Sequence, residues 1–213
     1  MSPSSPGAIP RASQSRPSAA VKRALRARIT AARLADSHRG AADRARLPHL
    51  LDACAGHATV ACYASTPPEP DTHALIAALA EAGVRVLLPV LRSATEPTWS
   101  WFTGPDALRP GWRGIPQPTG RVLGAETLAE AGFVWVSALA ATPRGDRLGT
   151  GGGWYDRALT HAGPGTRLGT MIGDDELLDA LPVDPWDVPV DVVVTPGGVL
   201  ATGARRPPAA SPE

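Results

Sequence analysis

The chain has 213 residues, of which 43% are hydrophobic and 19% are charged, and this composition predicts a single folded domain with a hydrophobic core. Lysine and arginine together number 21 against 20 acidic residues, for a net charge of +1, so we expect no surface for nucleic acid or for acidic membranes. The sequence has no run of about 18 apolar residues that could span a membrane and no apolar signal-peptide core near its start. We therefore expect a soluble, cytoplasmic protein.

The ends of the chain differ in composition from its middle. Residues 1–20 and 203–213 are rich in serine and proline and hold few side chains that could enter a core, so we expect two disordered tails. The domain is expected to cover residues 21–202. Its two cysteines, Cys54 and Cys62, are too few for a disulfide framework or a structural zinc site.

The domain opens with helical patterns. From Val21 to Ala32, apolar residues recur every three or four positions on one stripe, which indicates an amphipathic helix. A second helical segment covers residues 41–55 and is interrupted or begun at Pro48. The short apolar run at 58–64 is typical of a buried strand.

One β-α-β unit follows these segments. Thr72 can cap a helix that Gly83 ends, and the next strand covers residues 84–90. The remaining expected elements are an edge or hairpin strand around Trp99, a short helix at 126–132, an apolar strand at 133–140, a helix at 154–162, and strands at 166–173 and 190–195. Strands that alternate with helices, several of them apolar throughout, predict an α/β fold with an open, mostly parallel sheet and helices on both faces.

The most informative segment lies between the strand that ends near residue 140 and the helix that begins near Trp154. Four of the five residues 149–153 are glycines, which allow backbone N–H groups to turn toward one point, and the following helix N-terminus adds partial positive charge. At the carboxyl end of a strand in an open α/β sheet, such a loop suits phosphate; a long glycine-rich turn is the alternative. A dinucleotide-binding turn would need glycine where Trp154 stands, and a P-loop would need a lysine that the segment lacks.

Charged residues accompany the glycines. Arg147 lies just before them, and Asp156 falls in the first helical turn after them, where a carboxylate could hold Mg²⁺ beside phosphate oxygens. Asp187 lies in a loop before the last apolar strand and could be a second carboxylate for a metal. A phosphate site with a magnesium ion is therefore one interpretation of this segment.

Two further sets of charged residues are candidates. Lys22 and Arg26 lie one helical turn apart and could both reach an anion, although two such cations also occur on solvated helix faces. Glu69 follows the strand at 58–64, again at a carboxyl end, although acids are common in surface loops. The histidines show no paired metal-ligand spacing, and the nucleophile motif of serine hydrolases is absent.

A resemblance joins these pieces. The run at 147–156 has the pattern R-L-G-x-G-x-G-[YW]-Y-D, with KRALR at 22–26, EPDT at 69–72 and GIPQP at 114–118 in the expected order. In these motifs the chain resembles the 5-formyltetrahydrofolate cyclo-ligase family, over nearly its whole length between the tails. The resemblance implies a three-layer α/β fold and an ATP- and Mg²⁺-dependent conversion of 5-formyltetrahydrofolate to 5,10-methenyltetrahydrofolate, with release of ADP and phosphate.

The resemblance also implies roles for individual residues. Lys22 and Arg26 resemble the amino-terminal ATP contacts, and Lys22 would take part in catalysis. The main phosphate site would consist of Arg147, Leu148, Gly149, Thr150, Gly151, Gly152, Gly153, Trp154 and Tyr155, with Arg147 catalytic. Asp156 and Asp187 look like the magnesium ligands, while Glu69 and Tyr155 would contact the folate. ATP and a reduced folate are thus the expected partners, and a monomer is expected.

The implied chemistry suits these residue types. The formyl oxygen of the substrate is a poor leaving group until it is phosphorylated, and phosphoryl transfer needs alignment and charge neutralisation more than a strong base. Some positions depart from the family's usual residues, namely Thr150, Trp154, Trp186, Thr142 and Ser137. A divergent member that binds nucleotide or folate without efficient turnover is therefore the alternative function, and a sugar-phosphate enzyme on a related scaffold is a third.

Overall fold

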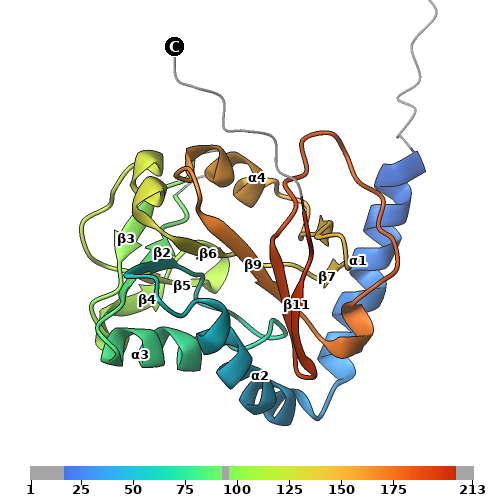
Figure 1. Ribbon diagram of the computed structural model, residues 1–213, viewed down its shortest axis with the longest axis horizontal. Coiled ribbons are helices and arrows are strands. Elements are labelled where there is room, and N and C mark those ends of the chain that lie inside the picture. Colours follow the sequence, from blue (N-terminus) through green and yellow to red (C-terminus); the bar gives the residue numbers. More distant parts are fainter. Residues whose placement is uncertain (1–16, 93–95, 205–213) are drawn as a thin grey trace, which may run out of the picture.

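The computed structural model describes residues 17–92 and 96–204. A central sheet divides this part of the protein into layers (Figure 1). Its strands lie in the order β11 (Gly198–Ala201), β10 (Val192–Thr195), β9 (Arg167–Met171), β6 (Phe133–Trp135), β1 (Thr59–Ala61), β2 (Arg85–Pro89) and β3 (Trp99–Trp101). The five inner strands are parallel, and the two edge strands are antiparallel to their neighbours. The predicted α/β fold with a mostly parallel sheet is confirmed.

Helices and short turns cover the sheet. The α-helices are α1 (Pro17–Ala35), α2 (Arg39–Ala53), α3 (His73–Glu81) and α4 (Trp154–Ala158). The 3-10 turns are η1 (Pro105–Ala107), η2 (Trp112–Gly114), η3 (Ala125–Glu130), η4 (Leu159–His161) and η5 (Asp174–Glu176). Two small hairpins complete the fold: β4 (Leu108–Pro110) with β5 (Pro116–Pro118), and β7 (Ala140–Ala141) with β8 (Arg147–Leu148).

The apolar residues form a core on each face of the sheet. On one face, α2 and α3 pack against alternate strand residues such as Val60 and Phe133. On the other face, η3, α4 and η4 cover Ala61 and Val134, the neighbours of those residues along their strands. A third, smaller cluster around Ile29 joins α1 to the β7–β8 hairpin. Because strand side chains alternate between the faces, strands buried on both sides read as continuous apolar runs.

The first helices follow the predictions in type and differ in their limits. The helix predicted from Val21 begins earlier, at Pro17, inside the expected tail. The helix α2 continues through Pro48, where an interruption or a start was predicted. Of the two predicted tails, residues 1–16 and 205–213 lie outside the described part of the chain. No described helix is both long enough and apolar enough to cross a membrane.

The predicted cap of α3 is wrong in one respect. Thr72 does precede the helix, but its hydroxyl donates to the carbonyl of Tyr63 at 2.5 Å rather than capping the helix. The carboxylate of Asp71 instead accepts from the backbone N–H groups of His73 and Ala74, at 3.0 and 3.4 Å. Two side chains that favour caps stand in succession here, and the tertiary contact with Tyr63, just after β1, decided which one turned inward.

The predicted strand at 133–140 is also wrong in its extent. The strand β6 ends at Trp135, and the chain then leaves the sheet. The carbonyl of Ala138 accepts a hydrogen bond from the Arg33 side chain at 3.0 Å, where a longer strand would have offered it to its neighbour. The helices predicted at 126–132 and 154–162 are likewise shorter: the first is the 3-10 turn η3, and the second is α4 followed by η4. The strand β11 was not predicted.

Candidate active site

The glycine run at 149–153 needs glycine for its backbone at only some positions. Gly151 and Gly153 have φ of +104° and +61°, which side-chain-bearing residues rarely adopt, and a Cβ on Gly151 would lie 3.2 Å from Cζ of Arg26. Gly152 has no such φ, and a Cβ there would meet no atom within 4 Å. The fold therefore does not explain the glycine at 152. Open space beside a bare backbone is what a closely approaching ligand requires.

The hydrogen bonds of this run use its carbonyl groups and not its backbone N–H groups. Residues 149–153 donate no backbone hydrogen bond to any part of the chain that the structure describes. The carbonyl of Gly149 instead accepts from Arg26 Nε at 2.8 Å, and that of Gly152 accepts from Arg157 Nη2 at 2.9 Å. Because C=O and N–H point in opposite directions across a trans peptide, the two arginines hold the following N–H groups on the open side of the loop.

Two features of the loop differ from the sequence-based expectation. The run follows β8 of the small hairpin rather than a strand of the central sheet. The helix after it, α4, has only five residues, so that few aligned peptide dipoles stand behind the loop. The positive charge at the loop comes from arginine side chains instead.

Arg147 lies beneath the loop and is almost buried, with 8% of its surface exposed. Its Nε donates to the carbonyl of Val188 at 3.1 Å, and its Nη2 pairs with Oδ1 of Asp156. The N–H of Val188 also donates to that oxygen, at 3.4 Å. A guanidinium has five N–H groups, and these two bonds do not use Nη1. Nη1 lies 3.8 Å from where a Cβ on Gly149 would be, so it is close to the glycine run.

Lys22 is held by two carboxylates from the loop before β10. Its Nζ lies 2.7 Å from Oδ2 of Asp184 and 2.6 Å from Oδ2 of Asp187. Burial alone would lower the pKa of Lys22, but the hydrogen bonds and charges of the two carboxylates outweigh it and raise the pKa above its ordinary value. Lys22 is therefore a fixed positive charge. Asp184 was missed by the sequence analysis, although the spacing D-P-W-D, with an acid at each end of a turn, was visible.

The two predicted magnesium ligands, Asp156 and Asp187, are both paired with cations. Their bonds to described residues use Oδ1 of Asp156 and Oδ2 of Asp187, including one from the N–H of Asp184 to Asp187 at 2.8 Å. One oxygen of each carboxylate is left. Mg²⁺ is usually held by one or two carboxylates together with substrate phosphates and water, so this donor set fits the ion. Val188, which follows Asp187 in the chain, donates its N–H to Asp156. No group of three or more potential ligands occurs among the described residues.

Glu69 lies at the carboxyl end of β1 with its carboxylate fixed on both oxygens. Oε2 accepts from the N–H of Thr66 at 2.9 Å, and Oε1 accepts from the hydroxyl of Ser137 at 2.7 Å. The hydroxyls of Tyr63 and Tyr155 are buried and have no hydrogen-bond partner in the described chain. Burial raises the pKa of both phenols well above its ordinary value, and the charge of Glu69 adds to the shift. Two protonated donors therefore stand within electrostatic reach of one carboxylate.

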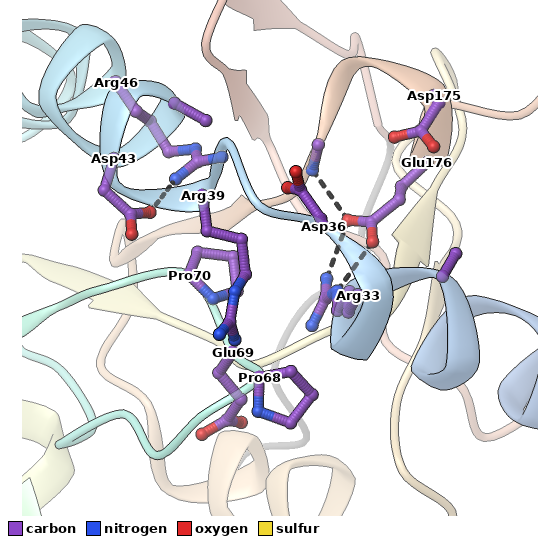
Figure 2. A pocket seen from close by; sticks show the side chains of 13 residues that line it. Arg33, Asp36, Arg39, Asp43, Arg46, Pro68, Glu69, Pro70, Asp175 and Glu176 are labelled. Carbon is purple, nitrogen blue, oxygen red and sulfur yellow. Dashed lines mark hydrogen bonds and ion pairs between the residues drawn. The ribbon is translucent and has the colours of Figure 1, made fainter.

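A cavity of about 110 Å³ adjoins Glu69 (Figure 2). On one side, Arg33 forms a bidentate pair with Glu176, with N–O distances of 2.6 and 2.7 Å. On the other side, Arg46 pairs with Asp43 at 2.6 Å, while Arg39 reaches into the space toward Glu69. We call this space the Glu69 cavity. None of its charged residues apart from Glu69 was singled out from the sequence, because their pairing depends on elements far apart in the chain.

The predicted site residues thus fall into two groups. Lys22, Arg26, the glycine run, Arg147, Asp156 and Asp187 are joined by direct contacts. Glu69 belongs to a second group and is linked to the first by Tyr155. The ring of Trp154 packs inside the protein, with its centroid 5.2 Å from that of Trp99 and 5.0 Å from that of Tyr155. The side chains of Thr150 and Trp186 are exposed.

Comparisons with known proteins identify the family of the chain. The 5-formyltetrahydrofolate cyclo-ligase family matches residues 18–196. Over 149 residues, the chain is 41% identical to a 5-formyltetrahydrofolate cyclo-ligase from Mycolicibacterium smegmatis, covering 67% of this chain and 76% of the relative. Over 144 residues, it is 35% identical to the enzyme of the same name from Escherichia coli, covering 66% and 79%.

Solved structures give the same result. The NMR structure of the Aquifex aeolicus 5,10-methenyltetrahydrofolate synthetase superimposes with a TM-score of 0.72 at 25% identity, covering 88% of this chain and 95% of that one. The Mycoplasma pneumoniae 5,10-methenyltetrahydrofolate synthetase shares the fold, with a TM-score of 0.66 at 20% identity and coverage of 82% and 98%. With the family match spanning nearly all of the described residues, this chain belongs to the 5-formyltetrahydrofolate cyclo-ligase family.

Proposed function

We propose that the protein catalyses the ATP-dependent cyclisation of 5-formyltetrahydrofolate to 5,10-methenyltetrahydrofolate, with release of ADP and phosphate. The observation that carries the proposal is the glycine run whose N–H groups are unused by the described protein and whose carbonyls are held by Arg26 and Arg157. Donors fixed in this way are suited to the oxygens of a terminal phosphate. Family membership supplies the substrate class.

The chemistry proceeds in three steps. The formyl oxygen attacks the γ-phosphorus of ATP, and the bond from that phosphorus to the ADP oxygen breaks. The nitrogen N10 then adds to the activated formyl carbon and loses its proton, which the departing phosphate can take. Finally the carbon–oxygen bond breaks, phosphate leaves, and the five-membered methenyl ring is closed with its positive charge shared by N5 and N10.

The protein's part is to hold charge and position. Arg147 and Lys22 supply two fixed positive charges near the loop, and both are held by carboxylates that keep their side chains in place. Charge developing on the transferred phosphoryl group would be met by these cations and by the loop N–H groups without any rearrangement. This account needs no activated serine, cysteine or histidine.

The folate would lie at the second group. The carboxylate of Glu69 can accept from N–H groups of the pteridine ring, while the unpartnered hydroxyls of Tyr63 and Tyr155 can donate to its oxygens. Tyr155 lies directly before Asp156 in the chain, so one short segment would contact both substrates. Asp156 and Asp187 would hold Mg²⁺, which neutralises phosphate charge when bound.

A coupled measurement tests the proposal. Purified protein with MgATP and 5-formyltetrahydrofolate is expected to give a rise in methenyl absorbance matched one-to-one by ADP. Arg147→Ala is expected to lower kcat by about 10²–10³-fold because a preorganised donor is lost. Arg147→Lys keeps the charge and guards against a fold defect. Absence of both products from the parent protein would refute the proposal.

A binding protein without turnover is the second candidate, and the exposed Thr150 favours it because no charged side chain projects from the loop. Arg26 weakens this candidate, since its guanidinium lies against Gly151 and brings a cation to the loop from α1. Calorimetric binding of ATP or folate together with zero ADP release would decide for it.

Two further expectations, that the protein is a monomer and that it is cytoplasmic, remain predictions.

A further inference from the structure

A second cavity, of about 320 Å³, lies between the residues that follow β2 and the β4–β5 hairpin. We call it the hairpin pocket, and the residues that matter for its chemistry are Arg92, Arg109, Gln117 and Thr119. Its volume is within the range of small-molecule sites, roughly 300–1,000 Å³. The proposed chemistry above uses none of these residues.

The lining of the hairpin pocket consists of donors and apolar groups. Arg92 and Arg109 bring two positive charges, and none of the described residues that line the pocket is an aspartate or a glutamate. The amide oxygen of Gln117 accepts from the N–H of Leu91 at 3.0 Å, so the NH₂ end of that amide is the part left to bind a ligand. A lining of this kind complements carboxylates.

The Glu69 cavity has the opposite character. Its three arginines face five acids, and two of those arginines are already paired with Glu176 and Asp43. A further carboxylate would enter a lining with excess negative charge. Of the two cavities, only the hairpin pocket therefore favours an anion.

The hairpin pocket and the proposed folate site lie at the same edge of the sheet. Glu69 follows β1, and Val90 and Arg92 follow β2, its parallel neighbour, so both segments leave the sheet at the same edge. On the other side of β1 is β6, which is followed by Ser137, the residue that bonds Glu69. A ligand that reacts near Glu69 can therefore extend over the end of the adjoining strand into the pocket.

We propose that the hairpin pocket binds the glutamate carboxylates of the folate substrate, through Arg92 and Arg109. This inference rests on the proposed function and deepens it. A reduced folate carries its reacting N5 and N10 at one end and a benzoylglutamate with two carboxylates at the other. The pocket would make affinity depend on that tail, and on further glutamates joined to it, without taking part in the chemical step.

Equilibrium binding tests this assignment independently of turnover. Calorimetry is performed with 5-formyltetrahydrofolate, with its polyglutamate, and with the 5-formyltetrahydropteroate that lacks the glutamate. Arg92→Gln and Arg92→Glu are expected to weaken binding of the two glutamylated ligands by about 3–10-fold, with the larger loss for Glu, as for a partly exposed charged hydrogen bond. Binding of the pteroate is expected to stay unchanged.

Arg121→Gln is the matched control, because Arg121 is an exposed arginine of the same segment that does not line the pocket. Arg92 is preferred to Arg109 for the test, since Arg109 also donates to the carbonyls of Asp106 and Leu108. Equal losses for glutamylated and pteroate ligands, or no loss for either, would overturn the assignment. A loss of affinity in Arg39→Gln that is specific to the glutamylated ligands would also overturn it, because it would show that the glutamate tail binds in the Glu69 cavity. If all ligands bound as expected but no methenyl product formed, the proposed function would be refuted and the assignment of the hairpin pocket would still hold.

Discussion

The two ends of α1 place buried cations against carboxylates from the same part of the chain, and they do so in different ways. At the carboxyl end, Glu176 accepts two bonds from Arg33 and one from the N–H of Gly173, so both of its oxygens are satisfied. At the amino end, Lys22 binds one oxygen each of Asp184 and Asp187. A saturated pair can only hold elements together, whereas an unsaturated one keeps capacity for a ligand.

The saturated pair gives the largest expected effect. Arg33→Met leaves Glu176 buried without its partner, and the free energy of unfolding is expected to fall by about 3–5 kcal/mol. Urea denaturation measures this loss. The double change Arg33→Met with Glu176→Leu should recover part of it, while kcat of the protein that remains folded should change little. Full stability in the single variant would contradict the structural role of this end.

The unsaturated pair is expected to behave in the reverse manner. Lys22→Met should lower kcat by about 10²–10³-fold, because a preorganised charge near the phosphate is lost. Its cost in unfolding free energy should be only about 1 kcal/mol, since both carboxylates are partly exposed. Steady-state kinetics and urea denaturation of the same preparation separate the two. If Lys22→Met lost stability and kept its activity, the Lys22 end of α1 would have only a structural role, like the Arg33 end.

The glycine run allows the same contrast within five residues. Gly152→Ala adds a methyl group in open space, so stability should stay within about 0.5 kcal/mol, while the KM for ATP should rise about 10–100-fold if a phosphate contact is lost. Gly151→Ala places a side chain at φ +104° against Arg26 and should cost about 1–3 kcal/mol of stability. If the KM for ATP were unchanged in Gly152→Ala, the glycine run would be a turn and not a phosphate site.

The smallest expected effect is a loss of stability at alkaline pH that comes from the Lys22 end of α1. Because the pKa of Lys22 in the folded protein is raised above 10.5, the stability from its pairs is fully present below pH 10.5 and is lost as the pH rises through the folded value. Lys22→Arg keeps its charge over this range. The urea midpoints of parent and variant should therefore run in parallel below pH 10.5 and diverge above it, with the parent falling faster. Parallel curves throughout would show that the charge of Lys22 adds nothing to stability.

The sequence was sufficient for the β-α-β unit, the parallel sheet and the glycine run, because these depend on local periodicity and on short motifs. It could not show that the apolar run at 133–140 breaks after Trp135, since a strand and the segment that leaves it are equally apolar. Arg33 pairs with Glu176, Lys22 with Asp187, and Glu69 with Ser137, and the members of these pairs are 68 to 165 positions apart in the chain. Such contacts leave no local pattern, and only the folded chain brings them together.

The central claim is that the N–H groups of residues 149–153, with Arg147 beside them, receive the terminal phosphates of ATP. A crystal structure with Mg²⁺ and a non-hydrolysable ATP analogue tests it most directly. The account predicts phosphate oxygens within hydrogen-bond distance of these N–H groups and the metal on Asp156 and Asp187. Phosphates bound elsewhere, with the loop N–H groups facing only water, would contradict it.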